Sequence, residues 1–110
     1  LSRKPGENLA KLGLAQTQLL IRTEGLELNV VLDESTKNPT DIALQLRAAD
    51  VEIVNGGVEA AFARLIQAVR STSGDERTKV KDHLLNLFAL VDQSDPRLAA
   101  ARKELASALF

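Results

Sequence analysis

A repeat with a fixed period constrains the fold of this chain more than any other feature of its sequence. Pro5 and Pro39 lie 34 residues apart, and the apolar pattern after the first recurs in step after the second. This period is typical of a helix-turn-helix unit that stacks on its neighbours, because one unit cannot bury its apolar face alone. We therefore expect function to reside in a surface. Three rows of apolar residues share the period: Leu12, Leu46 and Val80; Leu19, Ile53 and Leu87; and Leu20, Val54 and Phe88.

The composition indicates one domain with an aliphatic core. With 110 residues, the chain is long enough for a single modest core. It has three Phe, no Trp and no Tyr, so Leu, Ala, Val and Ile must fill the interior. The sequence contains no cysteine, which excludes disulfides and thiolate metal sites and favours a reducing, cytoplasmic location. No signal peptide and no apolar run near the roughly 20 residues of a membrane span is visible, so we expect no membrane partner.

The charge of the chain is nearly balanced overall but unevenly distributed. A formal net charge of −1 gives no general attraction to nucleic acid, so we expect no nucleic-acid partner. Residues 24–59 hold eight acidic and two basic side chains, a local charge of −6. This acidic band would favour a basic partner, although the solvated faces of ordinary helical proteins carry similar charge.

Proline and glycine mark where helices are expected to begin and end. Asn38 can cap a helix whose first position is Pro39, because proline lacks the N–H that this position leaves unbonded. Asp95 and Pro96 repeat this arrangement, and Gly74 lies at a break between two further helices. We expect helices at about residues 7–23, 39–55, 57–71, 75–91 and 95–109.

The segment 24–37 does not match the pattern of its surroundings. Its apolar residues Leu26, Leu28, Val30 and Leu32 alternate as in a strand, but a lone strand in a helical chain has no partner strand. The 34-residue period instead places a second helix here. The segment is therefore either a short, degenerate helix or an irregular connector whose apolar side chains cover the core.

The helix expected at 57–71 carries the clearest apolar stripe. Val58, Ala61, Phe62, Leu65 and Val69 follow the spacing of one helix face, so this face must pack on neighbouring helices. The helix at 75–91 places Val80, Leu84, Leu87, Phe88 and Val91 on one side in the same way.

The segment GGVEAAFARLIQAVR resembles the second half of a tetratricopeptide repeat. Gly56, Ala61, Leu65 and Ala68 fill the glycine, small, bulky and small positions of that pattern. Small residues at these positions let two helices approach closely, while the bulky one fills the space between them.

Residues 39–110 resemble the C-terminal domain of the tetratricopeptide thioredoxins, the YbbN-like or chaperedoxin family. The resemblance rests on ADVEIVNGGVEAAFARLIQAVR, GDERTKVKDHLLNLFALV and DPRLAAARKELASALF, in this order. It implies that a thioredoxin-like domain, not contained in this chain, precedes the region. It also implies a chaperone-associated holdase or protein-binding role, with protein clients or other chaperones as partners. The cysteine chemistry of that family has no matching residue here.

These observations predict an all-α fold, a tetratricopeptide-like array of antiparallel helix pairs. Residues 1–110 would form a single domain, with a degenerate first repeat at about 1–38, a second at 39–73 and a third helix pair at 74–110. The predicted function is that of a protein–protein interaction module in a thioredoxin-fold chaperone. The alternative is a structural or homo-oligomerisation domain that pairs with itself through its first and last helices, as a homodimer.

Arg47 and Asp50 are candidate protein-binding residues on the helix expected at 39–55. In a repeat array, one face of each first helix lines a concave groove that holds peptide segments. Asp50 would supply a polar contact there, with Arg47 nearby on the same helix. The alternative is that Asp50 makes a hydrogen bond at the edge of the core or is simply solvated, because each helix has one apolar stripe and the core needs it.

The end of the chain supplies two more candidates, Leu109 and Phe110. The last helix has no following repeat to cover its outer side, and helical arrays normally end in a polar face. Leu105 is expected to turn inward and seal the stack. Leu109 and Phe110 would then form a docking surface if they remain exposed.

We expect no enzymatic activity, no cofactor and no metal. His83 is the only histidine, and no cysteine can join it as a metal ligand, so we interpret it as a structural, partly buried residue. Asp92 and Asp95 lack the other oxygen ligands of a calcium loop, and helix capping explains them better. No phosphate-binding loop and no Ser-His-Asp set is visible.

Overall fold

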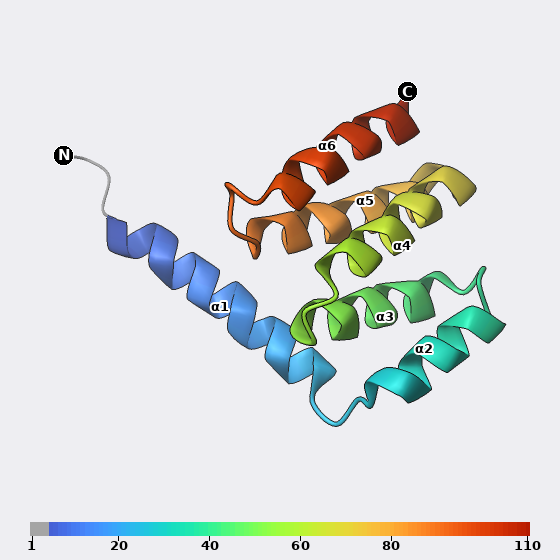
Figure 1. Cartoon of the computed structure of the whole chain (residues 1–110), viewed down its shortest axis with the longest axis horizontal. Helices are drawn as coiled ribbons and strands as arrows, with labels where there is room; N and C mark the ends of the chain where they lie inside the picture. Colours follow the sequence, from blue (N-terminus) through green and yellow to red (C-terminus); the bar gives the residue numbers. More distant parts are fainter. Residues whose placement is uncertain (1–4) are drawn as a thin grey trace.

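The computed structural model describes residues 5–110, which form six α-helices and no strand (Figure 1). The predicted all-α array is confirmed, and α3 to α6 run antiparallel to one another in chain order. Two helices fall within each of the three segments of the predicted division. The helices are α1 (Pro5–Thr23), α2 (Leu28–Lys37), α3 (Ile42–Val54), α4 (Val58–Ser71), α5 (Gly74–Ala89) and α6 (Pro96–Leu109).

The start of α3 differs from the prediction that Asn38 caps it. Asp41 is the N-cap, because its carboxylate accepts a hydrogen bond of 3.2 Å from the backbone N–H of Leu44. Asn38 instead ends α2, where its backbone N–H and its side chain both donate to the carbonyl of Glu34. Pro39 therefore lies in the turn between the two helices. At α6, by contrast, Asp95 caps the helix as predicted.

The turn between α3 and α4 depends on two glycines. Gly56 has φ of +85°, a left-handed conformation that side chains with a Cβ rarely adopt. Gly57 allows close packing, because a Cβ there would lie 3.3 Å from the carbonyl oxygen of Glu52. These glycines let α4 fold back directly against α3, and these two helices make the most extensive contact of any helix pair.

Segment 24–37 contains a helix, so the first of the two predicted alternatives is correct. Val31 and Ser35, one turn apart on α2, are buried, and Val31 packs against Ala48 and Val51 of α3. Val30, which belongs to the alternating set, is half exposed. The other three residues of that set, Leu26, Leu28 and Leu32, are partly buried against this cluster. The alternating pattern nevertheless misses Val31 and Ser35, which are buried because α2 contacts α3 through residues at helical spacing.

The main core lies between α3, α4, α5 and α6 and includes Leu19 of α1. The first two predicted rows contribute buried residues to it, although Ile53 is half buried and the side chain of Leu12 lies outside the described residues. The third row is not a core row, which corrects the prediction: Leu20 is 59% exposed and Val54 is 41% exposed, whereas Phe88 is buried. The residues buried most completely include Leu65, Leu84, Leu87, Leu98, Val51, Val69 and Val80.

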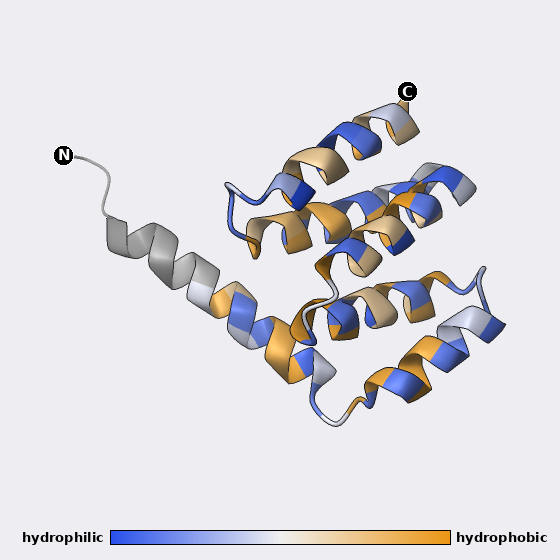
Figure 2. Ribbon diagram, viewed as in Figure 1, coloured by the Kyte–Doolittle hydropathy of each residue, from blue (hydrophilic) through white to orange (hydrophobic). Residues whose placement is uncertain are grey.

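Helix α1 extends away from the other helices and packs mainly against α3 through its C-terminal end (Figure 1). Figure 2 shows hydrophobic residues along this end of α1, and Leu14, Leu20 and Ile21 among them are exposed. At the opposite end of the array, α6 packs along α4 and runs parallel to it. This pairing of α4 with α6 creates the surface described next.

Candidate functional site

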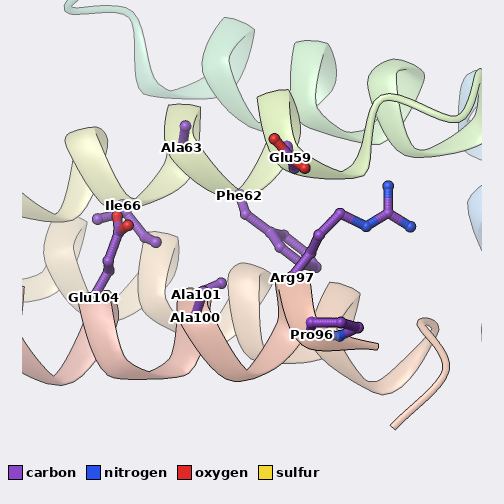
Figure 3. A pocket seen from close by; sticks show the side chains of 9 residues that line it. All are labelled: Glu59, Phe62, Ala63, Ile66, Pro96, Arg97, Ala100, Ala101 and Glu104. Atoms are coloured by element: carbon purple, nitrogen blue, oxygen red, sulfur yellow. The ribbon is translucent and has the colours of Figure 1, made fainter. Parts of the chain in front are cut away.

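A groove of about 420 Å³ runs between α4 and α6 (Figure 3). Phe62 and Ile66, one turn apart on α4, point toward α6 and form its floor, and both are buried. Ala100 and Ala101 face them from α6. The alanines create the hollow, because their short side chains leave space between two helices that pack side by side.

The floor of the groove is held in place from below. The ring of Phe62 meets the ring of Phe88 in α5 edge to face, with centroids 4.9 Å apart and an interplanar angle of 86°. This geometry is favourable for aromatic pairs and restricts the orientation of both rings. The groove is therefore a preformed feature, which needs no rearrangement of the core to open.

Charged residues lie at both ends of the groove. Glu59 and Arg97 flank the end nearest the start of both helices, and Glu104 flanks the other end near Ile66 (Figure 3). Arg97 donates to Oδ1 of Asp95 at 3.1 Å and to Oδ2 at 2.7 Å. These hydrogen bonds from Arg97 also hold the pKa of Asp95 below its ordinary value. The positive charge of Arg97 is thus already paired, and the carboxylates of Glu59 and Glu104 set the charge of the groove.

A second polar cluster joins α2, α3 and α4 through Arg64. Its guanidinium donates to Glu52 at 2.7 Å, to the side-chain oxygen of Gln45 at 2.8 Å and to the hydroxyl of Ser35 at 3.1 Å. Gln45 in turn donates to the backbone carbonyl of Ser35 at 3.0 Å. Glu52, Gln45 and Ser35 are buried, so the cluster satisfies polar groups that would otherwise destabilise the interior.

Asp50 lies where α1, α3 and α5 meet. Arg22 of α1 donates two hydrogen bonds to its two carboxylate oxygens, at 2.7 and 3.0 Å, and Nε2 of His83 in α5 lies 2.8 Å from Oδ1. Burial raises the pKa of the Asp50 carboxyl, but hydrogen bonds from His83 and Arg22 outweigh this effect, so the pKa lies below its ordinary value of 3.8. The carboxylate of Asp50 therefore connects α1 to α3 and α5 through its interactions with Arg22 and His83.

The structure places the four predicted protein-binding residues in different environments. Arg47 is exposed on α3. Asp50 is 4% exposed and makes the core-edge interactions of the predicted alternative, so its carboxylate is already occupied in the free chain. Leu109 is half buried against the core, whereas Phe110 is fully exposed. None of the four lines the groove between α4 and α6. A protein-binding role for Arg47, Asp50, Leu109 and Phe110 stays a prediction.

Sequence reasoning did not identify the partners of these buried charges. His83 is partly buried as predicted, but the pairing of Asp50 with both His83 and Arg22 was not anticipated. The available indication was the position of Asp50 and Glu52 within the apolar stretch AADVEIV, since buried acids require a cationic partner. Which of the basic residues supplies it depends on helix packing, because these partners are 12 to 33 residues away.

Two further features of the described residues concern metals and membranes. Within residues 5–110, no group of three or more histidine or acidic side chains is arranged to hold a metal ion. None of the helices described combines the length and the apolar character needed to cross a membrane.

Comparison with known proteins connects this architecture to a family. Residues 21–110 match the family model described as tetratricopeptide repeat. The chain is 42% identical, over its whole length, to uncharacterized proteins of Mycobacterium bovis and of two strains of Mycobacterium tuberculosis. The matched region is 36% of each relative, so the chain spans about a third of the length of these proteins. No solved structure matches the chain at a comparable level of significance.

Proposed function

Because the chain belongs to the tetratricopeptide repeat family, we propose that it is the protein-binding module of a thioredoxin-fold protein with chaperone or holdase activity. Domains of this family are protein–protein interaction modules, and their helical arrays offer extended surfaces for this purpose. The finer assignment is supported by the resemblance of residues 39–110 to the C-terminal domain of the tetratricopeptide thioredoxins. The partners would be protein clients, other chaperones and a thioredoxin-like domain, in the cytoplasm.

The groove between α4 and α6 is the observation that carries this proposal. It offers a preformed hollow whose accessible lining includes the apolar residues Ala63, Pro96 and Ala100, and such a surface can bind the apolar side chains of another protein. Phe110 adds a large apolar side chain that is fully exposed at the end of the array. Exposed aromatic residues frequently anchor protein–protein contacts, since they bury a large area at low entropic cost.

The proposal is tested by mixing the chain with reduced, unfolded lysozyme and following aggregation by light scattering. We expect suppression when the chain is in several-fold molar excess. Phe110→Ser should weaken suppression, because it removes an exposed apolar contact. Leu85→Ser, which removes an exposed apolar residue from α5, serves as the matched control and should leave suppression unchanged.

Absence of suppression at this excess would contradict a holdase role. It would favour a structural or homo-oligomerisation domain, and a specific observation supports that second candidate. Leu14 and Ile21 lie two turns apart on one side of α1, and they are 59% and 64% exposed. Two copies of α1 packed through this side would bury both residues.

Self-association is tested by size-exclusion chromatography with light scattering. A dimer that Ile21→Lys converts to a monomer would support pairing through α1, because the charge could not be buried in the interface. A monomer at all protein concentrations would exclude the oligomerisation candidate and leave the client-binding proposal in place.

A further inference from the structure

We infer that the groove between α4 and α6 binds an extended peptide segment in which apolar residues are flanked by two basic residues. This inference rests on the proposed interaction function and specifies the chemistry of the partner at one site.

The floor of the groove determines the apolar part of the partner. Phe62 and Ile66 close the bottom of the groove but are each only 2% exposed, so the apolar surface open to a partner lies mainly on the walls, at Ala63, Pro96 and Ala100. An apolar side chain placed here would exchange water contact for contact with these three residues, which is favourable. None of the apolar residues of the groove can donate or accept a side-chain hydrogen bond, so this part of it offers nothing to a polar side chain.

The ends of the groove determine the basic part. Glu59 and Glu104 are both exposed, and neither makes a salt bridge within the described residues. Among the described residues, Arg97 is the one cation that lines the groove, and it is bound to both oxygens of Asp95. Arg97 also interacts electrostatically with Glu59, but Asp95 is its main partner and supplies a compensating negative charge. The groove therefore presents two negative charges, one near each end, which attract cations and repel acidic segments.

The spacing of these carboxylates sets the length of the partner. Glu59 and Ile66 are separated by seven residues of α4, and Arg97 and Glu104 by seven residues of α6. At about 1.5 Å per residue, the groove is roughly 10 to 12 Å long. An extended chain advances about 3.3 Å per residue and its side chains alternate between two faces, so two lysines with three residues between them share a face with the central residue. Such a segment places one ammonium group near each carboxylate and the central apolar side chain in the groove.

The site is also independent of the interactions that hold the fold together. The buried carboxylates of Asp50 and Glu52 are bound by cations from other helices, and neither residue contributes to the rim charges of the groove. Occupation of the groove would therefore leave both polar clusters intact, and substitutions at its rim test binding without removing a core contact.

The inference is tested with a fluorescein-labelled peptide, Lys-Ala-Leu-Ala-Lys, whose leucine shares a face with both lysines in the extended conformation. Its binding to the chain is followed by fluorescence anisotropy. We expect saturable binding that weakens with added salt, because screening reduces the attraction of exposed charges. The peptide Glu-Ala-Leu-Ala-Glu should bind at least tenfold more weakly. Equal binding of the two peptides would overturn the inference.

Two matched pairs of variants locate the binding site. Glu59→Gln with Glu104→Gln should weaken binding about two- to tenfold, in line with two exposed ion pairs. Glu24→Gln with Glu34→Gln changes the net charge by the same amount elsewhere and should have no effect. Ala100→Arg places a long cation in the groove and should abolish binding, whereas Ala106→Arg, on another side of α6, should not. Equal effects within either pair would overturn the assignment to this groove.

The outcomes separate this inference from the proposed function. Suppression of lysozyme aggregation without binding of either peptide would refute the basic-segment groove while supporting the interaction module. Peptide binding that responds to the variants, without suppression of aggregation, would support the groove and refute the holdase role. Loss of both activities would refute both.

Discussion

Helix α1 and the array formed by α3 to α6 carry apolar residues at equivalent positions of the repeat but bury them to different extents. Leu20 of α1 is 59% exposed, whereas Phe88, which lies two repeat lengths later in α5, is 2% exposed. Phe88 lies between neighbouring helices and contacts the ring of Phe62, while α1 packs mainly on α3 alone. Whether an apolar side chain in a repeat array is buried therefore depends on the helices that pack on both sides of its own helix. Its apolar character alone does not bury it.

The two regions are joined by charge as well as by apolar contact. Leu19 is the buried apolar contribution of α1 to the main core, and Arg22 attaches the same end of the helix to Asp50. His83 attaches α5 to the same carboxylate. The orientation of α1 is thus set within its last turns, by one buried apolar residue and a partly buried ion pair.

The largest effect is expected in the array itself. Leu65→Ala should lower the free energy of unfolding by about 2 to 5 kcal/mol, because Leu65 is fully buried and the change leaves a cavity. Thermal unfolding followed by circular dichroism measures this, with Leu85→Ala at an exposed position of α5 as the control. An unchanged melting temperature for Leu65→Ala would contradict the core described for α4.

A smaller effect on the free energy of unfolding is expected at Asp50, which connects α1 to the array. Asp50→Asn should cost about 1 to 3 kcal/mol, because Arg22 and His83 lose the charge that they bind while both remain partly accessible to water. Hydrogen exchange should speed up in the last turns of α1 more than in α4. Uniform acceleration in all helices would indicate that Asp50 stabilises the array and has no special role at α1.

The interactions of Asp50 with Arg22 and His83 also predict that the stability of the fold depends on pH. The pKa of Asp50 is lowered by folding, so its contribution to stability is complete above its ordinary value of 3.8 and is lost as the pH falls through the lowered value. The difference in melting temperature between the wild-type chain and Asp50→Asn should therefore shrink as the pH falls below about 4. A difference that grows in this pH range would show that the sign of the shift is wrong.

The smallest effect is expected on the exposed side of α1. Leu20→Ala should change the free energy of unfolding by less than about 0.5 kcal/mol, because Leu20 is exposed and both residues favour helix. Urea unfolding measures this difference. A cost comparable to that of Leu65→Ala would mean that α1 is covered in solution, and its dependence on protein concentration would identify a second copy as the cover.

Much of the fold could be predicted from the sequence, because helix periodicity and caps are local. The stripe through Phe62 and Leu65 predicted α4 to within one residue at its start, and Asp95 with Pro96 predicted the start of α6. The predicted start of α3 was wrong. Asn38 and Asp41 are both good capping residues, and which of them caps α3 depends on where α2 ends.

The groove was not predicted, and its residues show why. Phe62, Leu65 and Val69 were all interpreted as core, and no local property distinguishes the edge of Phe62 that lines the groove from the part that meets Phe88. The hollow exists only because the alanines of α6 lie opposite this edge. The two acidic residues at its ends, Glu59 and Glu104, are far apart in the sequence, and only the packing of α4 against α6 places both of them at one groove.

The sequence by itself determined that this chain forms helices, where most of them lie and which faces are apolar, since these properties depend on residues within a few positions of one another. Tertiary structure alone decided which apolar residues are covered, which cations bind Asp50 and Glu52, and where a groove remains open. The physical reason is that burial and ion pairing depend on contacts between helices, and these contacts join residues far apart in the chain.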